Sequence, residues 1–172
     1  MSDQESPSVP AGMSLATVWE TVADTVPDAP ALAHGDLVRT WSELEERSAR
    51  IAAHLDAAGV GHDAKVACYL YNGPEYLEAT FAAFKVRAVP INVNYRYLEA
   101  ELQYLLDNAD AEAVVFDAEF VERLDHVRSS LPGVRVWLCV GSDAEHPLPE
   151  WAEDYEASIA AAEPMPRVDR SG

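Results

Sequence analysis

Residues 65–92, KVACYLYNGPEYLEATFAAFKVRAVPIN, combine two apolar runs with a helical repeat between them. The first run, Lys65–Tyr71, follows a Gly-His-Asp turn and predicts a buried strand. Pro74 suits the first turn of a helix. The inner face of that helix is expected to consist of Leu77, Phe81 and Phe84. A second strand is expected at Ala88–Val93, so the stretch predicts a strand-helix-strand unit with parallel strands.

The alternation of strands and helices continues as far as residue 140. The predicted elements are a helix built on Leu98, Leu102 and Leu105 that ends near Asn108, a strand at Glu112–Phe116, a helix capped by Asp117 that uses Val121, Leu124 and Val127, and a strand at Val134–Val140. Strands without apolar-polar alternation are typical of sheets buried on both faces. The sequence therefore predicts a three-layer α/β fold, with a mostly parallel sheet flanked by helices.

Upstream of this unit, the sequence predicts a β-hairpin between two helices. Ser14 offers an N-cap for the first helix, and Pro27 ends it. Two short runs at residues 31–33 and 37–40 flank a turn that contains Gly35. Glycine in such a turn is a hairpin signal, so an N-terminal β-hairpin is expected here.

The helix after the hairpin has clear signals at both of its ends. Thr40 and Glu43 stand three residues apart, as in a capping box. Gly59 suits the left-handed residue that follows a helix. Its buried stripe is expected to contain Leu44, Ile51, Leu55 and Ala58.

The two ends of the chain differ in composition from the middle. Residues 1–13 are polar and are expected to form a disordered tail. Residues 14–142 would form the folded unit, and residues 143–172 an acidic helix with a connecting segment. In that last part Trp151, Tyr155 and Ile159 recur every four residues, which predicts one docked helix.

The charge of the chain limits its partners. It has 30 acidic and 12 basic residues, a formal net charge of −18. Such a surface repels phosphate backbones and anionic membranes, which argues against a nucleic-acid partner. The charge indicates either solubility, including a high-salt habitat, or an acidic contact surface for a partner. With no apolar run near the roughly 18–20 residues of a membrane span and no signal-peptide pattern, a cytoplasmic location is expected.

No sequence motif assembles a catalytic or metal site. The chain contains no GxGxxG, GxxxxGK[ST] or GxSxG pattern, and its five histidines form no helical metal pair. Cys68 and Cys139 lie within apolar runs and are expected to be buried and inert. We therefore predict no catalytic residue and no metal ligand here, although residues that meet only in space would escape this search.

The most polar ordered stretch is Asn92–Tyr97, which directly follows a predicted strand. It is therefore expected at the carboxyl edge of the parallel sheet, where such folds bind ligands. Asn94 and Arg96 are the candidate substrate-binding residues, because amide and guanidinium groups can bond a carbonyl or phosphate. Alternatively, the amides satisfy the loop backbone and Arg96 pairs with a helix carboxylate.

Several motifs occur in the order found in one known family. They are TWSEL at 40–44, AAHL at 52–55, Gly59-Val60, KVA at 65–67 with Asn72 and Glu75, FAAFK at 81–85, AVPIN at 88–92, and Glu101-Leu102 with Tyr104 and Leu105. Together they cover about residues 14–140 and resemble the AMP-dependent synthetases and ligases. Residues 85–97 look most like acyl-CoA ligases of the fatty-acid and steroid side-chain type, although Arg87 stands where many relatives carry Gly.

The resemblance implies a function for the whole enzyme. A carboxylic-acid substrate would attack ATP to give an acyl-adenylate, and CoA would then displace AMP, with Mg as the metal. Residues 14–142 would be the N-terminal subdomain of the AMP-binding domain, and the remainder of that domain would be their partner. The family's phosphate loop has no counterpart in this chain, so the chain alone is expected to bind no cofactor and to be inactive. The alternative is a free-standing, catalytically dead interaction module with an acidic contact surface around Trp151 and Tyr155.

Overall fold

The computed structural model describes residues 14–168 of the chain. The helices are α1 (Leu15–Thr25), α2 (Trp41–Ala57), α3 (Pro74–Lys85), α4 (Glu99–Asn108), α5 (Val121–Val127) and α6 (Tyr155–Ala161), with 3-10 turns at η1 (Ala118–Phe120) and η2 (Arg128–Ser130). The strands are β1 (Pro30–His34), β2 (Leu37–Thr40), β3 (Lys65–Tyr69), β4 (Val89–Asn92), β5 (Ala111–Asp117), β6 (Val136–Val140) and β7 (Glu153–Asp154). The tail expected at residues 1–13 lies outside the described residues.

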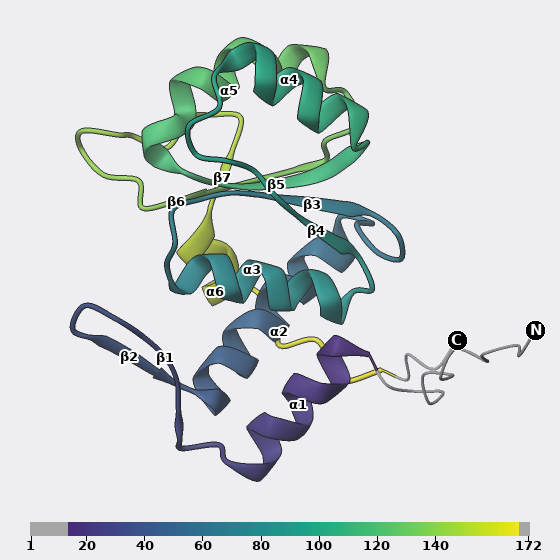
Figure 1. The fold of residues 1–172 in the computed structure, drawn as a ribbon, viewed down its shortest axis with the longest axis vertical. Coiled ribbons are helices and arrows are strands. Elements are labelled where there is room, and N and C mark those ends of the chain that lie inside the picture. The colour runs from purple at the N-terminus through teal and green to yellow at the C-terminus, as the bar shows by residue number, and fades with distance from the viewer. Residues whose placement is uncertain (1–13, 169–172) are drawn as a thin grey trace, which may run out of the picture.

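The sheet at the centre of the fold is parallel throughout. Its five strands run in the order β4-β3-β5-β6-β7, and every neighbouring pair is parallel. Helices α4 and α5 cover one face, and α2, α3 and α6 cover the other (Figure 1). Strands β1 and β2 form a separate antiparallel hairpin beside α1 and α2. The predicted three-layer α/β fold with an N-terminal hairpin is confirmed.

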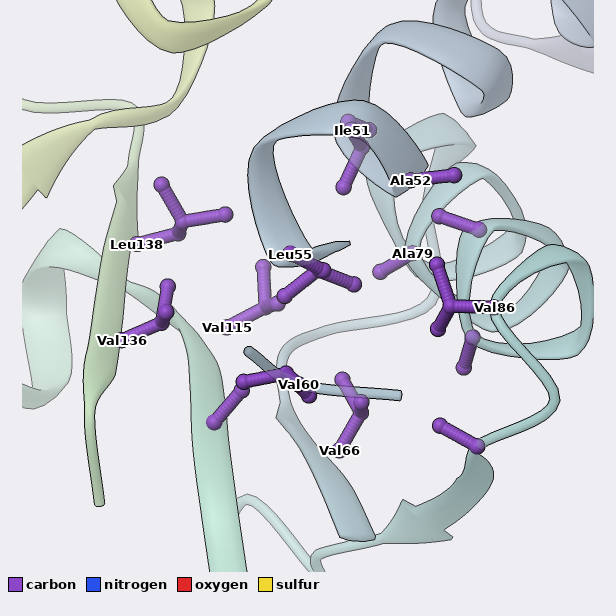
Figure 2. Close-up of a cluster of buried hydrophobic side chains, with 14 of the residues drawn as sticks. Ile51, Ala52, Leu55, Val60, Val66, Ala79, Val86, Val115, Val136 and Leu138 are labelled. Atoms are coloured by element: carbon purple, nitrogen blue, oxygen red, sulfur yellow. The ribbon is translucent and has the colours of Figure 1, made fainter. Parts of the chain in front are cut away.

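Both faces of the sheet are buried, which explains why the strands show no apolar-polar alternation. Along β3, Val66 and Cys68 face the layer of α2, α3 and α6, whereas Ala67 and Tyr69 face α4 and α5; all four are fully buried. Figure 2 shows the first of these cores, in which Leu55 of α2 lies close to Val115 of β5.

Local signals place the ends of the first two helices. The Ser14 hydroxyl accepts a hydrogen bond from the Thr17 amide at 3.1 Å and caps α1. Thr40 and Glu43 form the predicted capping box, with bonds of 3.3 and 2.8 Å between side chains and amides. Gly59 has φ +75°, the left-handed conformation that favours glycine after a helix.

A buried carboxylate joins four elements of the fold. Glu78 of α3 is fully buried, and Arg47 Nε of α2 donates to its Oε1 at 2.8 Å. Arg39 Nε of the hairpin lies 3.0 Å from the same oxygen, as an ion pair without hydrogen-bond alignment. The Tyr155 hydroxyl of α6 donates to Oε2 at 3.0 Å. Two cations and a hydroxyl therefore offset the cost of burying this charge.

A buried cation attaches α1 to the same layer. Lys85, at the end of α3, is 1 % exposed, and its Nζ lies 2.8 Å from Glu20 of α1 and 2.7 Å from Glu45 of α2. Aromatic packing surrounds this ion pair, since the Trp19 ring meets Phe81 edge-on at 4.7 Å between centroids. The first helix is thus held by a charge network as well as by apolar contact.

Two predicted helix faces are partly wrong. Leu77 of α3 is 37 % exposed, and Glu78, one position on, is buried in its place. Leu98 is the exposed N-cap of α4, whose buried residues are Leu102 and Leu106. In both helices, apolar residues spaced three or four positions apart are compatible with two adjacent helix faces. Packing against the neighbouring layer determines which of the two faces is buried.

The predicted docked helix near residue 155 exists but begins later than expected. Trp151 precedes it and stacks on Phe116 at 5.5 Å, in the core beneath α4 and α5. Tyr155 and Ile159 lie in the core on the other side of the sheet. Between Trp151 and Tyr155 the chain passes from one face of the sheet to the other as the edge strand β7. The residues that recur every four positions therefore lie in two different cores.

Replacing Leu55 by Ala should lower the free energy of unfolding by about 2–5 kcal/mol, because it leaves a cavity between α2 and the sheet. Leu77→Ala is the matched control, and its exposed position predicts a change of about 0.5 kcal/mol or less. Urea denaturation followed by circular dichroism measures both. If the free energy of unfolding falls equally in the two variants, the contrast between buried Leu55 and exposed Leu77 is contradicted.

Glu78→Gln should lower the free energy of unfolding by about 3–5 kcal/mol, because Arg39 and Arg47 lose their shared carboxylate. Glu156→Gln removes the other, exposed partner of Arg47 and should cost about 1 kcal/mol or less. If both variants unfold at the same urea concentration, the buried carboxylate does not hold these elements together.

Candidate functional site at the carboxyl edge of the sheet

The carboxyl ends of the parallel strands meet along one edge of the sheet. Strand β3 connects through α3 to β4 on one side, whereas β5 connects through α5 to β6 on the other. The connections therefore diverge between β3 and β5, and such a switch point is the usual ligand position in open parallel sheets. The loops after β3, β4 and β5 surround it.

The structure places both sequence-predicted residues, Asn94 and Arg96, in the loop after β4. Asn94 Oδ1 accepts a hydrogen bond from the Arg96 amide at 3.0 Å, and the Asn94 carbonyl accepts one from the Tyr97 amide at 2.9 Å. The Arg96 guanidinium lies 5.5 Å from the centre of the Tyr95 ring, and both candidate side chains are exposed. The Asn94 amide thus shapes the turn, as the alternative reading expected, while no carboxylate among the described residues pairs with Arg96.

Aromatic side chains line the edge beside this loop. The rings of Tyr69 and Phe120 stack at 4.3 Å, and that of Tyr71 lies 5.1 Å from both Phe120 and Tyr95. The Tyr71 hydroxyl donates to Glu119 at 3.1 Å. Burial raises the pKa of Tyr71, and the carboxylate of Glu119 raises it further.

Arg123 of α5 closes the edge from the other side of the switch point. Its Nη1 donates to the Tyr69 hydroxyl at 2.9 Å and to the Tyr95 carbonyl at 2.8 Å, with the Tyr97 carbonyl at 3.3 Å. Its guanidinium lies 5.3 Å from the centre of the Phe120 ring. Burial raises the pKa of Tyr69, and the bond from Arg123 opposes that rise. We call Tyr69, Tyr71, Tyr95, Phe120 and Arg123 the carboxyl-edge cluster.

Sequence reasoning did not identify the members of this cluster that lie outside the 92–97 loop. A signal was available, because Tyr71 comes just after β3 while Phe120 and Arg123 come just after β5. Residues that follow parallel strands converge at one edge, so their positions alone placed them near Asn94. Which of them touch depends on strand order, and strand order has no local signature.

A cleft of about 410 Å³ opens between the hairpin and the start of α3. Its lining is mostly apolar and consists of Leu32, Ala33, His34, Asn72, Gly73, Pro74, Tyr76 and Leu77. Asn72 and Gly73, in the loop after β3, form one wall of the cleft. Exposed Leu37 and Val38 lie on the second strand of the same hairpin.

A second groove, of about 530 Å³, lies between α5 and the segment before β7. Five carboxylates line it, together with partly buried Trp151; they are Glu119, Glu122, Asp125, Glu145 and Glu150. Tyr155 is 1 % exposed, so it cannot contribute to the acidic contact surface that the sequence suggested.

Within residues 14–168, no group of three or more His, Cys, Asp or Glu side chains is placed to hold a metal ion. At the N-terminus of α3, a Cβ on Gly73 would lie only 3.1 Å from Glu75 Oε2, so a carboxylate already occupies the positive end of the helix. Among the described residues, no helix has the length and apolar character needed to cross a membrane.

The family model for AMP-binding enzymes matches residues 19–170. A medium-chain acyl-CoA ligase (Mig) of Mycobacterium avium is 34 % identical over 89 % of this chain and 30 % of its own length. A 3-oxocholest-4-en-26-oate–CoA ligase of Rhodococcus rhodochrous is 38 % identical over 88 % of this chain and 28 % of its own. The chain thus spans less than a third of the length of these relatives.

Solved structures agree on the fold. The anthranilate CoA ligase AuaEII superposes with a TM-score of 0.84 over 94 % of this chain and 31 % of its own, at 17 % identity. A benzoate CoA ligase from Burkholderia xenovorans LB400 gives 0.77 over 93 % of this chain and 31 % of its own, at 23 % identity. At such low identities the likeness establishes the architecture alone.

Both thiols should resist modification in the folded chain. Burial raises the pKa of Cys68 to about 12 and that of Cys139 to about 11, so at pH 8 at most about one thiol in a thousand is ionised. Reaction with Ellman's reagent should be slow in buffer and should release two equivalents in guanidinium chloride. Rapid reaction of either thiol in buffer would contradict its place in the sheet.

Proposed function

The chain belongs to the AMP-binding enzyme family, and from this we propose that it is the amino-terminal part of an acyl-CoA ligase. One observation carries the proposal: acyl-CoA ligases match nearly nine-tenths of this chain with less than a third of their own length. The strands of the central sheet end at an open carboxyl edge. This arrangement is consistent with a structural role, in which the chain supports a larger domain.

The whole enzyme would join a carboxylic acid to CoA through an acyl-adenylate, with ATP and Mg. The printed sequence contains no counterpart of the family's phosphate loop, and a carboxylate already lies at the N-terminus of α3. The nucleotide phosphates and the metal would be held by the rest of the enzyme. The part of this chain would be to support the sheet and to form one wall of the substrate site.

That wall would be the loop after β4, where Asn94 and Arg96 remain the proposed substrate-binding residues. The Arg96 guanidinium is exposed at the carboxyl edge and lies against the Tyr95 ring, which orients it without neutralising its charge. It could therefore meet an anionic group of a ligand. The matched ligases act on medium-chain acids and on a steroid side-chain acid, which makes these the substrate classes to test first.

The remainder of the AMP-binding domain would be the partner of this chain. The cleft beside the hairpin is mostly apolar, and exposed Leu37, Val38 and Leu77 lie on the elements that form it. An apolar surface of this kind favours a protein contact over open solvent. The remaining two-thirds of such a ligase would supply that contact.

The alternative is an interaction module that keeps the fold without the chemistry. The acidic groove between α5 and β7 favours it, because its five carboxylates could receive a basic partner. The reading frame beyond codon 172 separates the two proposals: a phosphate-loop segment supports the ligase, and a stop codon supports the module.

An ATP–pyrophosphate exchange assay with medium-chain and steroid acids tests the proposal. The 172-residue chain alone should give no exchange above background, because the printed sequence contains no counterpart of the family's phosphate loop. A longer protein with this chain at its amino end should give exchange with at least one of these acids. Turnover by the chain alone, or none by the longer protein, would contradict the proposal.

A further inference from the structure

The loop that carries Asn94 and Arg96 is held to the sheet by a few contacts, among which Arg123 reaches it from a distant part of the chain. Within the loop the bonds are local: the Arg96 and Tyr97 amides donate to Asn94, and the Leu98 amide donates to Glu101 at 3.2 Å. Such short-range bonds define a turn but do not attach it to the sheet. Attachment comes from the Val93 amide, which donates to Cys68 at 3.1 Å, and from the carbonyls on the far side of the turn.

Those carbonyls converge on a single nitrogen of Arg123. The carbonyls of Tyr95 and Tyr97, together with the Tyr69 hydroxyl, lie 2.8, 3.3 and 2.9 Å from Nη1. The Tyr69 hydroxyl also donates to the Tyr97 carbonyl at 2.8 Å, which closes a small ring of polar contacts. The guanidinium thus connects the loop after β4 to α5, across the end of β3.

The surroundings of Arg123 distinguish it from the other internal arginines. Arg39 and Arg47 each lie within 3.0 Å of the buried carboxylate of Glu78, as fold-stabilising cations commonly do. Among residues 14–168, no carboxylate lies within ion-pair distance of Arg123, and its hydrogen bonds go to neutral oxygens at the sheet edge. The neighbouring Leu124, by contrast, is fully buried in the core.

We propose that Arg123 is a positioning residue, which fixes the 93–98 loop so that Asn94 and Arg96 face the ligand site, and that the rest of the fold does not depend on it. The proposal rests on the function proposed above in one respect, namely that this loop forms a wall of the substrate site. Arg123 would touch no substrate itself. Its effect would pass through the Tyr95 and Tyr97 carbonyls to the two exposed side chains.

Residue-resolved hydrogen exchange on the 172-residue chain tests the positioning. Arg123→Met should raise the exchange rates of the Arg96, Tyr97 and Leu98 amides by about tenfold or more, because charge-assisted bonds to the loop are lost. Amides of β5 should keep their rates. Arg123→Lys should retain most of the protection, since an ammonium group also offers several donors at one nitrogen.

Arg135→Met is the matched control. Arg135 Nη1 also donates to a backbone carbonyl, that of Gly59 at 2.7 Å, but it precedes β6 and so lies at the opposite edge of the sheet. This variant should leave the 96–98 amides unchanged. Unchanged exchange in Arg123→Met, an equal rise throughout β5, or a lysine variant that behaves like the methionine variant would overturn the positioning role.

Enzyme kinetics on the longer ligase test separately whether the 93–98 loop forms part of the substrate site. There Arg123→Met should raise the KM for the acid or for CoA by about tenfold while kcat changes less, as expected when a binding wall is displaced. If the loop amides exchange faster but neither KM changes, the loop is not part of the substrate site. That result would refute the proposed wall and leave the attachment of the loop by Arg123 in place.

Discussion

The carboxylate of Glu78 is the constraint on which much of the arrangement depends. A fully buried charge is tolerated only where opposite charges and donors reach it, and here they come from the hairpin, α2 and α6. Apolar packing tolerates small shifts of one helix on another, whereas two ion pairs and a hydroxyl at about 3 Å do not. Glu78 therefore defines how the hairpin and the last helix sit on α3.

Lys85 repeats this arrangement with the opposite charge. It stands seven residues after Glu78, on the same helix, and binds Glu20 of α1 and Glu45 of α2. Arg167 also reaches Glu45 at 3.5 Å, so the last described segment joins the same network. In a chain with a net charge of −18, these few cations lie where they neutralise carboxylates between layers. Other acidic residues lie at the surface, for example around the groove beside α5, where Asp125 pairs with Arg128.

The carboxyl edge is built differently from this charged interior. Its aromatic rings pack against one another, and Arg123, which reaches in from α5, binds neutral oxygens. The loop with Asn94 and Arg96 is therefore fastened at its backbone while its side chains stay exposed. This combination of a fixed backbone and available side chains suits a surface that meets a ligand or another part of a larger domain.

The features that can be read from the amino-acid sequence depend on local interactions. The order of strands and helices, the hairpin, the Ser14 cap and the Thr40–Glu43 capping box all depend on residues within a few positions of one another. The family resemblance came from the same ordered motifs, and it is confirmed by the family match over residues 19–170. The loop of Asn94 and Arg96 could also be placed at an edge, because parallel strands end together.

Contacts between residues far apart in the sequence follow from the three-dimensional packing and could not be predicted. The burial of Glu78 beside exposed Leu77, the position of Trp151 on the other face from Tyr155, and the contact of Arg123 with a loop 26–28 residues earlier all depend on strand order and layer contacts. The physical reason is that helical spacing defines a stripe but not its partner. A charged residue can join that stripe wherever a distant partner balances its charge, and no local pattern records where that partner lies.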